Sequence, residues 1–177
     1  MGTIVQSTLI SIDGVVDDPG SWAMSYFDDD SARDALELLK NSDAMLLGRN
    51  TYRELAARWA HETGPFADAI NSIRKYVFSR TLATAAWANS EILTADVAET
   101  VARLKNEENR NLVTYGYGPL GRTLLENGLL DELRFSVHPI IVGNPTAPFR
   151  TNPRTPLRLV ETRSRPSGVT VLTYSTH

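Results

Sequence analysis

Hydrophobic and polar positions along the chain fall into two alternating patterns. Short runs of β-branched or uniformly apolar residues predict strands, and apolar residues spaced three and four apart predict helices. The predicted strands are 3–12, 44–47, 75–79, 91–93, 111–115, 133–142, 157–162 and 169–174. The predicted helices are 31–40, 51–60, 66–73, 96–105 and 119–127, with an aromatic loop at 15–27.

This order of segments predicts the fold class. Strands that alternate with helices form a mostly parallel sheet with helices on both faces. The last two strands flank Arg165-Pro166-Ser167-Gly168, which predicts an antiparallel hairpin at the C-terminal end. We therefore expect residues 1–177 to form one three-layer α/β/α domain with a mixed, mostly parallel central sheet.

The start of the helix at 31–40 carries an unusual concentration of acids. Ser31 followed by Asp34 fits a capping pattern, so we expect Ser31 to open this helix. Asp28, Asp29 and Asp30 precede it, where carboxylates complement the helix dipole. No histidine adjoins them in the sequence, and we expect no metal site.

Composition excludes several classes of function. The hydrophobic fraction of 42% and the charged fraction of 22% are typical of a globular protein, and a net charge of −3 offers no basic surface for nucleic acid. The absence of cysteine excludes disulfides and thiol catalysis. No apolar run reaches the roughly 20 residues of a membrane helix, and the N-terminus lacks a signal pattern. We expect a cytoplasmic protein that acts on a small molecule and binds neither nucleic acid nor membrane.

Two glycine-containing segments lie where a predicted strand hands over to a helix. They are Leu47-Gly48-Arg49-Asn50-Thr51-Tyr52 and Tyr115-Gly116-Tyr117-Gly118-Pro119-Leu120-Gly121. Glycine lets a phosphate approach the backbone, and the helix N-terminus supplies free N–H groups and a positive dipole. Two such segments can hold the two phosphates of a dinucleotide, and the adjacent Arg49 suits the additional phosphate of NADPH.

Plainer interpretations of the same residues remain open. Arg49 also fits a surface ion pair, and each glycine segment also fits a turn before a helix. The second segment matches GxGxxG, but a Rossmann domain has this motif near its first strand, whereas here it comes late. Asp13-Gly14 fits a hairpin turn as well as a substrate-side position. His138 is more simply a structural histidine.

The ordered set of motifs resembles one family across nearly the whole chain. The pieces that carry the resemblance are Ser11-Ile12-Asp13-Gly14, Leu47 to Tyr52, Val77 to Leu82, Gly116 to Leu120, Leu124 to Leu133, and Pro139 to Gly143. The chain resembles the dihydrofolate reductase-like fold family, in the branch of the C-terminal reductase domain of the bacterial bifunctional riboflavin-biosynthesis deaminase-reductase. The resemblance also implies homodimerisation, for which strand 133–142 and the tail hairpin are the candidate segments.

The resemblance implies a role for each matching residue. Gly48, Arg49 and Thr51 would hold the adenosine-side phosphates, Ser79 and Arg80 would border the adenine ribose, and Gly116, Tyr117, Gly118, Pro119 and Leu120 would wrap the pyrophosphate. Asp13 and the loop containing Trp22 would lie near the nicotinamide and substrate, with Asp34 the nearest match to a substrate-gripping carboxylate. Tyr117 departs from the family in its bulk; its side chain could face solvent, stack on a ligand or obstruct the cofactor.

These roles imply an NADPH-dependent reductase. Hydride would pass from NADPH to a C=N or carbonyl carbon of a small heterocycle or its ring-opened sugar derivative, with 5-amino-6-(5-phosphoribosylamino)uracil the first candidate. The residue that supplies the proton is not assigned; Asp13, Asp34 and water are the options. Two alternatives stay open: dihydrofolate reduction, and an NADPH-binding module of the same fold without turnover.

Overall fold

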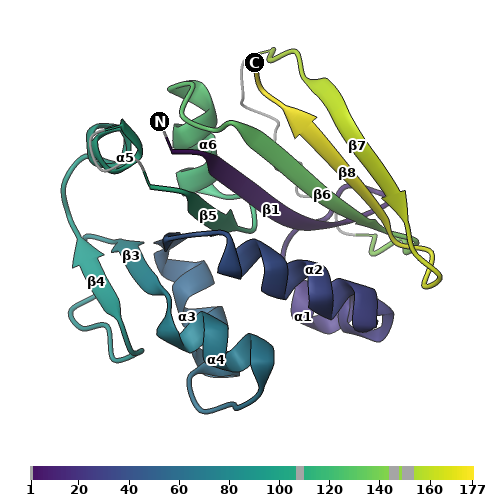
Figure 1. The fold of residues 1–177 in the computed structure, drawn as a ribbon, viewed down its shortest axis with the longest axis horizontal. Helices are drawn as coiled ribbons and strands as arrows, with labels where there is room; N and C mark the ends of the chain where they lie inside the picture. The colour runs from purple at the N-terminus through teal and green to yellow at the C-terminus, as the bar shows by residue number, and fades with distance from the viewer. Residues whose placement is uncertain (1, 107–109, 144–147, 149–153) are drawn as a thin grey trace.

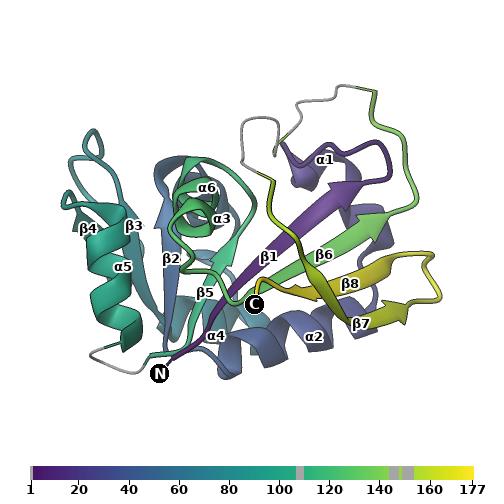
Figure 2. The same ribbon diagram turned by 90° about the horizontal axis from the view of Figure 1, so that it is seen from above.

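The computed structural model describes residues 2–106, 110–143, 148 and 154–177, and its centre is one eight-stranded sheet (Figure 1). The strands are β1 Ile4–Ser11, β2 Ala44–Gly48, β3 Arg74–Phe78, β4 Ser90–Leu93, β5 Leu112–Tyr115, β6 Glu132–His138, β7 Arg158–Ser164 and β8 Thr170–Ser175. Their order across the sheet is β4-β3-β2-β5-β1-β6-β8-β7, which Figure 2 shows from one edge to the other.

Helices cover both faces of this sheet. They are α1 Pro19–Trp22, α2 Asp29–Lys40, α3 Arg49–Trp59, α4 Pro65–Ser72, α5 Val97–Asn106 and α6 Pro119–Glu126, with a 3-10 helix at Met24–Tyr26. α5 and α6 lie on one face and α2, α3 and α4 on the other (Figure 1). Strands β1 to β6 pair in parallel, and β8 is antiparallel to both β6 and β7. The predicted three-layer, mostly parallel fold with a C-terminal hairpin is confirmed.

The apolar run of β2 contributes to two hydrophobic cores at once. Ala44, Met45, Leu46 and Leu47 are fully buried. Successive side chains of a strand point to opposite faces, so Ala44 and Leu46 join the core under α5 and α6, whereas Met45 and Leu47 join the core under α2, α3 and α4. A strand that is covered on both faces is therefore apolar at every position.

Two predicted boundaries differ most from those in the structure. The residue that caps α2 is Asp28, whose carboxylate accepts the Ser31 backbone N–H at 2.8 Å, so Ser31 lies inside the first turn. Aspartate is as good an N-cap as serine, and with Asp28 as the N-cap the helix begins at Asp29, two residues before the predicted start. β6 ends at His138 instead of continuing to Val142, because Pro139 has no backbone N–H to extend the ladder. The loop at 15–27 also contains α1 and the 3-10 helix.

The chain reverses its direction across the sheet at β5. β2 leads through α3 and α4 to β3 on its outer side, whereas β5 leads through α6 to β6 in the opposite direction. Right-handed crossovers that run in opposite directions place their helices on opposite faces. The carboxyl ends of the neighbouring strands β2 and β5 therefore diverge into a crevice. Within the described residues, no helix has the length and apolar character needed to cross a membrane.

Candidate cofactor and substrate site

The crevice between β2 and β5 is a topological switch point, the place where open α/β sheets bind ligands. Both predicted glycine segments meet there. A Cβ added at Gly116 would lie 3.8 Å from the Thr51 hydroxyl oxygen, and one added at Gly48 would lie 4.0 Å from the Leu120 Cβ. Turns about seventy residues apart in the sequence thus form the two walls of one crevice.

Helix α3 begins directly after β2 and presents its N-terminus to the crevice. Its N-cap is Gly48, which has no side chain to close the first turn, so the first N–H groups remain available to an anion. Arg49 is the first helical residue, and its exposed guanidinium donates to the Thr81 hydroxyl at 2.7 Å. This contact extends the guanidinium along the carboxyl edge of β3 and does not pair it with a carboxylate.

In the turn after β3, the side chain of the predicted residue Ser79 hydrogen-bonds to the backbone. The Ser79 hydroxyl accepts the backbone N–H groups of Thr81 and Leu82 at 3.3 and 3.0 Å, so it stabilises this turn. Arg80 is exposed beside it. Ser79 therefore positions Thr81 and, through Thr81, the Arg49 guanidinium.

The turn between β5 and α6 has a backbone conformation that favours glycine. Gly116 has a φ of +68°, which a residue with a side chain adopts only under strain. Gly118 is the N-cap of α6, and a Cβ added there would meet no heavy atom within 4 Å beyond its chain neighbours. Pro119 at the first helical position is exposed, whereas Leu120 packs against the core. The space above Gly118 is open to a ligand.

Tyr117 is directed away from solvent. It is only 7% exposed, and its ring carbons lie 3.1 and 3.3 Å from the position of a Cβ on Gly121. Gln6, fully buried on β1, donates its amide to the carbonyl of Gly116. Tyr117 and Gln6 therefore fix the turn from the α6 side. Gln6 was not predicted, although a polar residue in the middle of an apolar strand was a signal for it.

Strands β1 and β5 separate next to this turn. Their pairing ends at Ser7 and Tyr115, with the Gly116 N–H donating to the Ser7 carbonyl at 2.9 Å. β1 continues to Ser11 but pairs there only with β6, ending at His138. The edge of β1 from Thr8 onward thus forms a notch beside the glycine turn, where a flat ring can approach backbone polar groups.

Asp13 joins two loops by hydrogen bonds at the end of this notch. Its carboxylate accepts the Ser11 hydroxyl at 2.6 Å and the backbone N–H groups of Val142 and Gly143 at 3.1 and 2.9 Å. These hydrogen bonds, that of Ser11 foremost, lower the pKa of Asp13 from 3.8 to about 2. Asp13 is therefore ionised at neutral pH and holds the loop after β1 against the loop after β6, which ill suits it to donate a proton.

The hydrogen bonds that Asp13 accepts predict how the stability of the fold depends on pH. Because the folded-state pKa lies below the unfolded value, the stabilisation by Asp13 is complete above pH 3.8 and decreases as the pH falls toward 2. Carboxyl ¹³C NMR should show the Asp13 resonance titrating near 2. In Asp13→Asn this dependence should be absent. If Asp13 titrates with the ordinary pKa of 3.8, the proposed hydrogen bonds to its carboxylate are contradicted.

An aromatic cluster closes the α2 side of the notch. Trp22 is buried, donates its indole N–H to the Asp17 carbonyl at 2.9 Å, and meets the His138 ring edge-on at 5.4 Å. Tyr26 meets His138 in the same way at 5.8 Å. Burial lowers the pKa of His138, so the imidazole is neutral at physiological pH. Trp22 is placed near the predicted substrate side, as part of a packed wall.

Asp34 lies in an ion-pair cluster away from the glycine turns. Its carboxylate accepts from Arg165 at 2.6 Å and from Arg163 at 3.1 Å, and the Arg165 side chain is only 8% exposed. Arg165 also contacts Asp28 at 3.5 Å and Ser31. The acids at the start of α2 thus anchor the β7–β8 hairpin. The structure does not bring Asp34 to the predicted cofactor residues.

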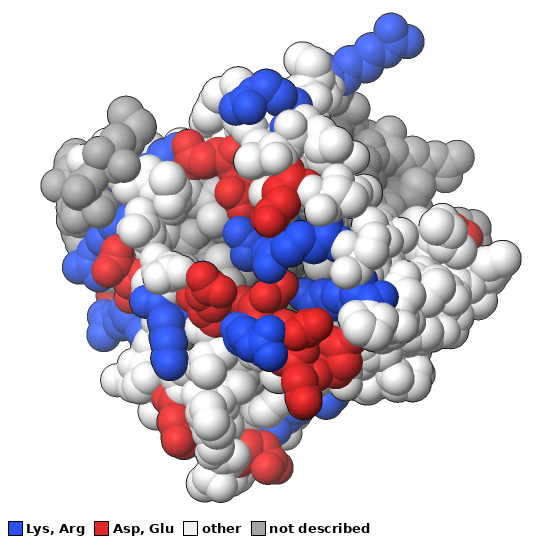
Figure 3. All heavy atoms as spheres, turned by 45° about the vertical axis from the view of Figure 1, so that its right-hand side comes forward, with Lys and Arg blue, Asp and Glu red and all other residues white. Residues whose placement is uncertain are grey.

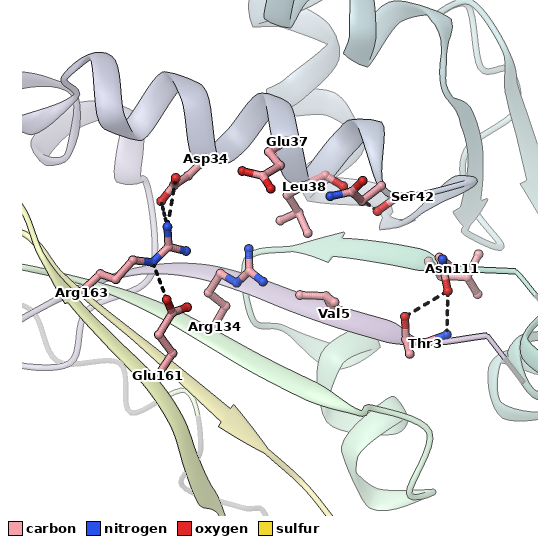
Figure 4. Close-up of a pocket in the computed structure, with 12 residues that line it drawn as sticks. Thr3, Val5, Asp34, Glu37, Leu38, Ser42, Asn111, Arg134, Glu161 and Arg163 are labelled. Atoms are coloured by element: carbon pink, nitrogen blue, oxygen red, sulfur yellow. Dashed lines mark hydrogen bonds and ion pairs between the residues drawn. The ribbon is translucent and has the colours of Figure 1, made fainter.

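A groove of about 480 Å³ lies beside this cluster, between α2 and strands β1, β6 and β7. Figure 4 shows Asp34 and Glu37 pointing from α2 toward Arg134, Arg163 and Glu161 on the sheet. The groove extends toward the amino ends of the strands, away from the glycine turns at their carboxyl ends. Its polar lining fits a small, hydrogen-bonding molecule better than a dinucleotide.

Comparison with known proteins agrees with this architecture. The model of the RibD C-terminal domain matches residues 3–171. The chain belongs to the RibD C-terminal domain family. The predicted family is therefore confirmed, and the chain shares its fold with reductases of the riboflavin pathway.

The chain is similar to several known proteins. An uncharacterized protein of Bacillus subtilis, YyaP, is 30% identical over 148 residues, which cover 78% of this chain and 76% of YyaP. A putative riboflavin biosynthesis protein from Shewanella sp. PV-4 has the same fold, with a TM-score of 0.80, 18% identity and 98% of both chains covered. The Thermotoga maritima diaminohydroxyphosphoribosylaminopyrimidine deaminase/5-amino-6-(5-phosphoribosylamino)uracil reductase gives 0.68 and 15%, with 98% of this chain and 56% of that chain covered.

Proposed function

We propose that this RibD C-terminal domain is an NADPH-dependent reductase of a small heterocyclic or ring-opened sugar substrate. One observation carries the proposal: two helices with glycine N-caps, α3 and α6, begin at the carboxyl ends of neighbouring strands and enclose one crevice. A helix N-terminus can bind an anion, so two of them at one crevice support the binding of a dinucleotide's phosphate groups. Family membership supports an oxidoreductase.

Each wall of the crevice has a part in holding the cofactor. The open backbone at Gly116 and Gly118 would hold the pyrophosphate, and the Arg49 guanidinium would hold the 2′-phosphate that distinguishes NADPH from NADH. The notch beside Ser7 would receive the flat nicotinamide ring of the cofactor. NADPH supplies the hydride, and the protein fixes the distance and excludes water.

The identity of the substrate is a further part of this proposal. Reduction of 5-amino-6-(5-phosphoribosylamino)uracil is the first candidate because of the family. Dihydrofolate reduction is less well supported, since Asp34 already has two arginine partners and is not available to grip a pterin. A non-catalytic NADPH-binding module would show cofactor binding without turnover. Homodimerisation stays a prediction; the edge strand β7, which exposes Leu159 and Val160, is the segment that a second copy could cover.

Replacing Arg49 with alanine tests the cofactor assignment. A guanidinium–phosphate hydrogen bond contributes about 1.5–3 kcal/mol, so the Kd for NADPH should rise roughly 10- to 100-fold while the Kd for NADH stays unchanged. Titration with quenching of tryptophan fluorescence measures both constants. Arg53→Ala, one turn further along α3 and exposed, is the matched control and should leave both constants unchanged.

Two results would overturn parts of the proposal. If the wild-type protein binds neither nucleotide, the assignment of both glycine turns is wrong. If NADPH binds and no substrate in a heterocycle panel that includes dihydrofolate is reduced, the chain is a binding module of this fold.

A further inference from the structure

Two lysines of the described chain are buried, and only one of them has a carboxylate partner. Lys105 pairs with Asp131 at 2.7 Å, whereas Lys75, fully buried on β3, forms no ion pair with a described residue. On the face drawn in Figure 3, lysine and arginine side chains lie at the surface beside aspartate and glutamate. A buried charge without a counter-ion is costly, and burial lowers the pKa of Lys75 to about 8. The contacts of its ammonium show what this charge holds together.

The Lys75 ammonium contacts three backbone carbonyls and one aromatic ring. It donates to the carbonyls of Asn71, Ile73 and Ala88 at 3.2, 2.9 and 3.0 Å, and it lies 4.4 Å from the centre of the Trp87 ring. Asn71 and Ile73 are at the end of α4, whereas Trp87 and Ala88 belong to the segment between β3 and β4. An ammonium has three N–H donors, and all three are used here. Lys75 therefore holds the end of this segment against α4.

Two further hydrogen bonds hold Trp87 in place. Its indole N–H donates to the side-chain oxygen of Asn71 at 2.6 Å, and its backbone N–H donates to the Tyr52 hydroxyl at 3.0 Å. Tyr52 belongs to α3, and its ring lies 6.0 Å from the Trp87 ring. Trp87 and Tyr52 are both buried. We call Lys75, Asn71, Trp87 and Tyr52 the lysine cage; together they join α3, α4 and the segment between β3 and β4.

The segment that the lysine cage holds is also the segment that contains Thr81. Residues 79–89 connect β3 to β4 without a helix or a strand. The Ser79 hydroxyl fixes the near end of this segment, and the lysine cage fixes the far end. Thr81 accepts from the Arg49 guanidinium at 2.7 Å. Because a chain without regular structure has many conformations available, the position of Thr81 depends on such anchors.

Helix α3 contacts this segment at two positions that are one turn apart. Arg49 donates to Thr81, and Tyr52, three residues further along the helix, accepts from Trp87. Residues three apart lie on the same side of a helix. A shift of Trp87 away from Tyr52 would therefore also move Thr81 away from Arg49. The guanidinium would then lose the hydrogen bond that orients it.

We propose that Lys75 and Trp87 are positioning residues for the 2′-phosphate of NADPH: through the segment between β3 and β4 they orient the Arg49 guanidinium, and so set the preference for NADPH over NADH. This inference rests on the proposed function, because Arg49 is the group assigned to that phosphate. Both residues act through Arg49, and neither is assigned a contact with the cofactor. A guanidinium that is already oriented loses less side-chain entropy when the phosphate binds.

Substitutions in the lysine cage test this role by titration calorimetry with NADPH and with NADH. The measured quantity is the Kd for NADH divided by the Kd for NADPH. Trp87→Phe removes the indole N–H and keeps a ring, whereas Lys75→Met removes the ammonium and keeps an unbranched side chain. Each should lower this ratio about 3- to 10-fold, less than Arg49→Ala does, because the guanidinium is still present but has to be ordered on binding. If Lys75→Met does not fold, Trp87→Phe decides the question alone.

Two controls separate positioning from a general loss of stability. Lys105→Met removes the other buried lysine, which belongs to α5 on the opposite face of the sheet; it should lower the melting temperature and leave the ratio unchanged. In the Arg49→Ala background, Trp87→Phe should not change the Kd for NADPH any further, because no guanidinium is left to orient. Additive losses in this double variant, or an unchanged ratio in a folded Trp87→Phe protein, would overturn the inference.

The same measurements distinguish failure of this inference from failure of the proposed function. A wild-type protein that binds NADH as tightly as NADPH would refute the assignment of Arg49, and the inference with it. A preference for NADPH that Arg49→Ala removes, but that Trp87→Phe and Lys75→Met both retain, would refute the inference and leave the cofactor assignment in place.

Discussion

Replacing Asp131 with alanine is expected to lower the free energy of unfolding by about 3 kcal/mol, the largest single stability effect that we predict. Asp131 lies between α6 and β6, and its carboxylate accepts from the Lys105 ammonium at 2.7 Å and from the Ile4 backbone N–H at 2.7 Å. The Lys105 side chain is only 6% exposed. Without Asp131 this charge stays buried, with the Leu129 carbonyl its remaining contact, and the start of β1 loses an acceptor.

A double substitution shows whether the buried charge causes the loss. Lys105→Met removes the ammonium, so Asp131→Ala should cost less in that background than in the wild type. Urea denaturation of the four proteins measures the difference. Equal costs in the two backgrounds would show that the Ile4 contact, and not the ion pair, accounts for the effect.

The fold could be predicted because its information is local. A buried strand such as β2 is apolar at every position, and an amphipathic helix such as α2 repeats every three to four residues, so each element shows its type within its own segment. The errors also have local causes. Two acceptable caps, Asp28 and Ser31, stand three residues apart, and the sequence does not say which one the helix uses. The effect of Pro139 on β6 could have been predicted from its missing N–H.

The site could be predicted only where a short motif carries it. Gly48 and Gly116 lie at strand-to-helix turns that the sequence reveals, and the sheet order brings these turns together. The contacts that shape the rest join distant segments. Gln6 reaches Gly116 across 110 residues, and Asp34 reaches Arg165 across 131. No periodicity reports such pairs, so the sequence does not reveal that Asp34 pairs with Arg165 of the β7–β8 hairpin.

Replacing Gly118 with leucine is expected to abolish NADPH binding, with a Kd at least 100-fold higher, while the fold stays intact. The backbone at Gly118 is extended, with a φ of −145°, so a side chain causes no strain there. Its Cβ would enter open space, since no heavy atom beyond the chain neighbours lies within 4 Å. Exchanging a glycine N-cap for leucine should cost less than about 1 kcal/mol. The leucine side chain would instead occupy the space where the pyrophosphate should lie.

A graded series makes this prediction specific. Gly118→Ala adds one methyl group and should weaken NADPH less than leucine does, and both variants should melt within a few degrees of the wild type. Calorimetric titration with NADPH and thermal unfolding measure the two properties on the same samples. Unchanged affinity in the leucine variant would mean that the space above Gly118 holds no ligand, and the cofactor would then have to lie elsewhere along the crevice. Lost affinity together with a collapsed melting temperature would show that Gly118 supports the fold, which its open surroundings argue against.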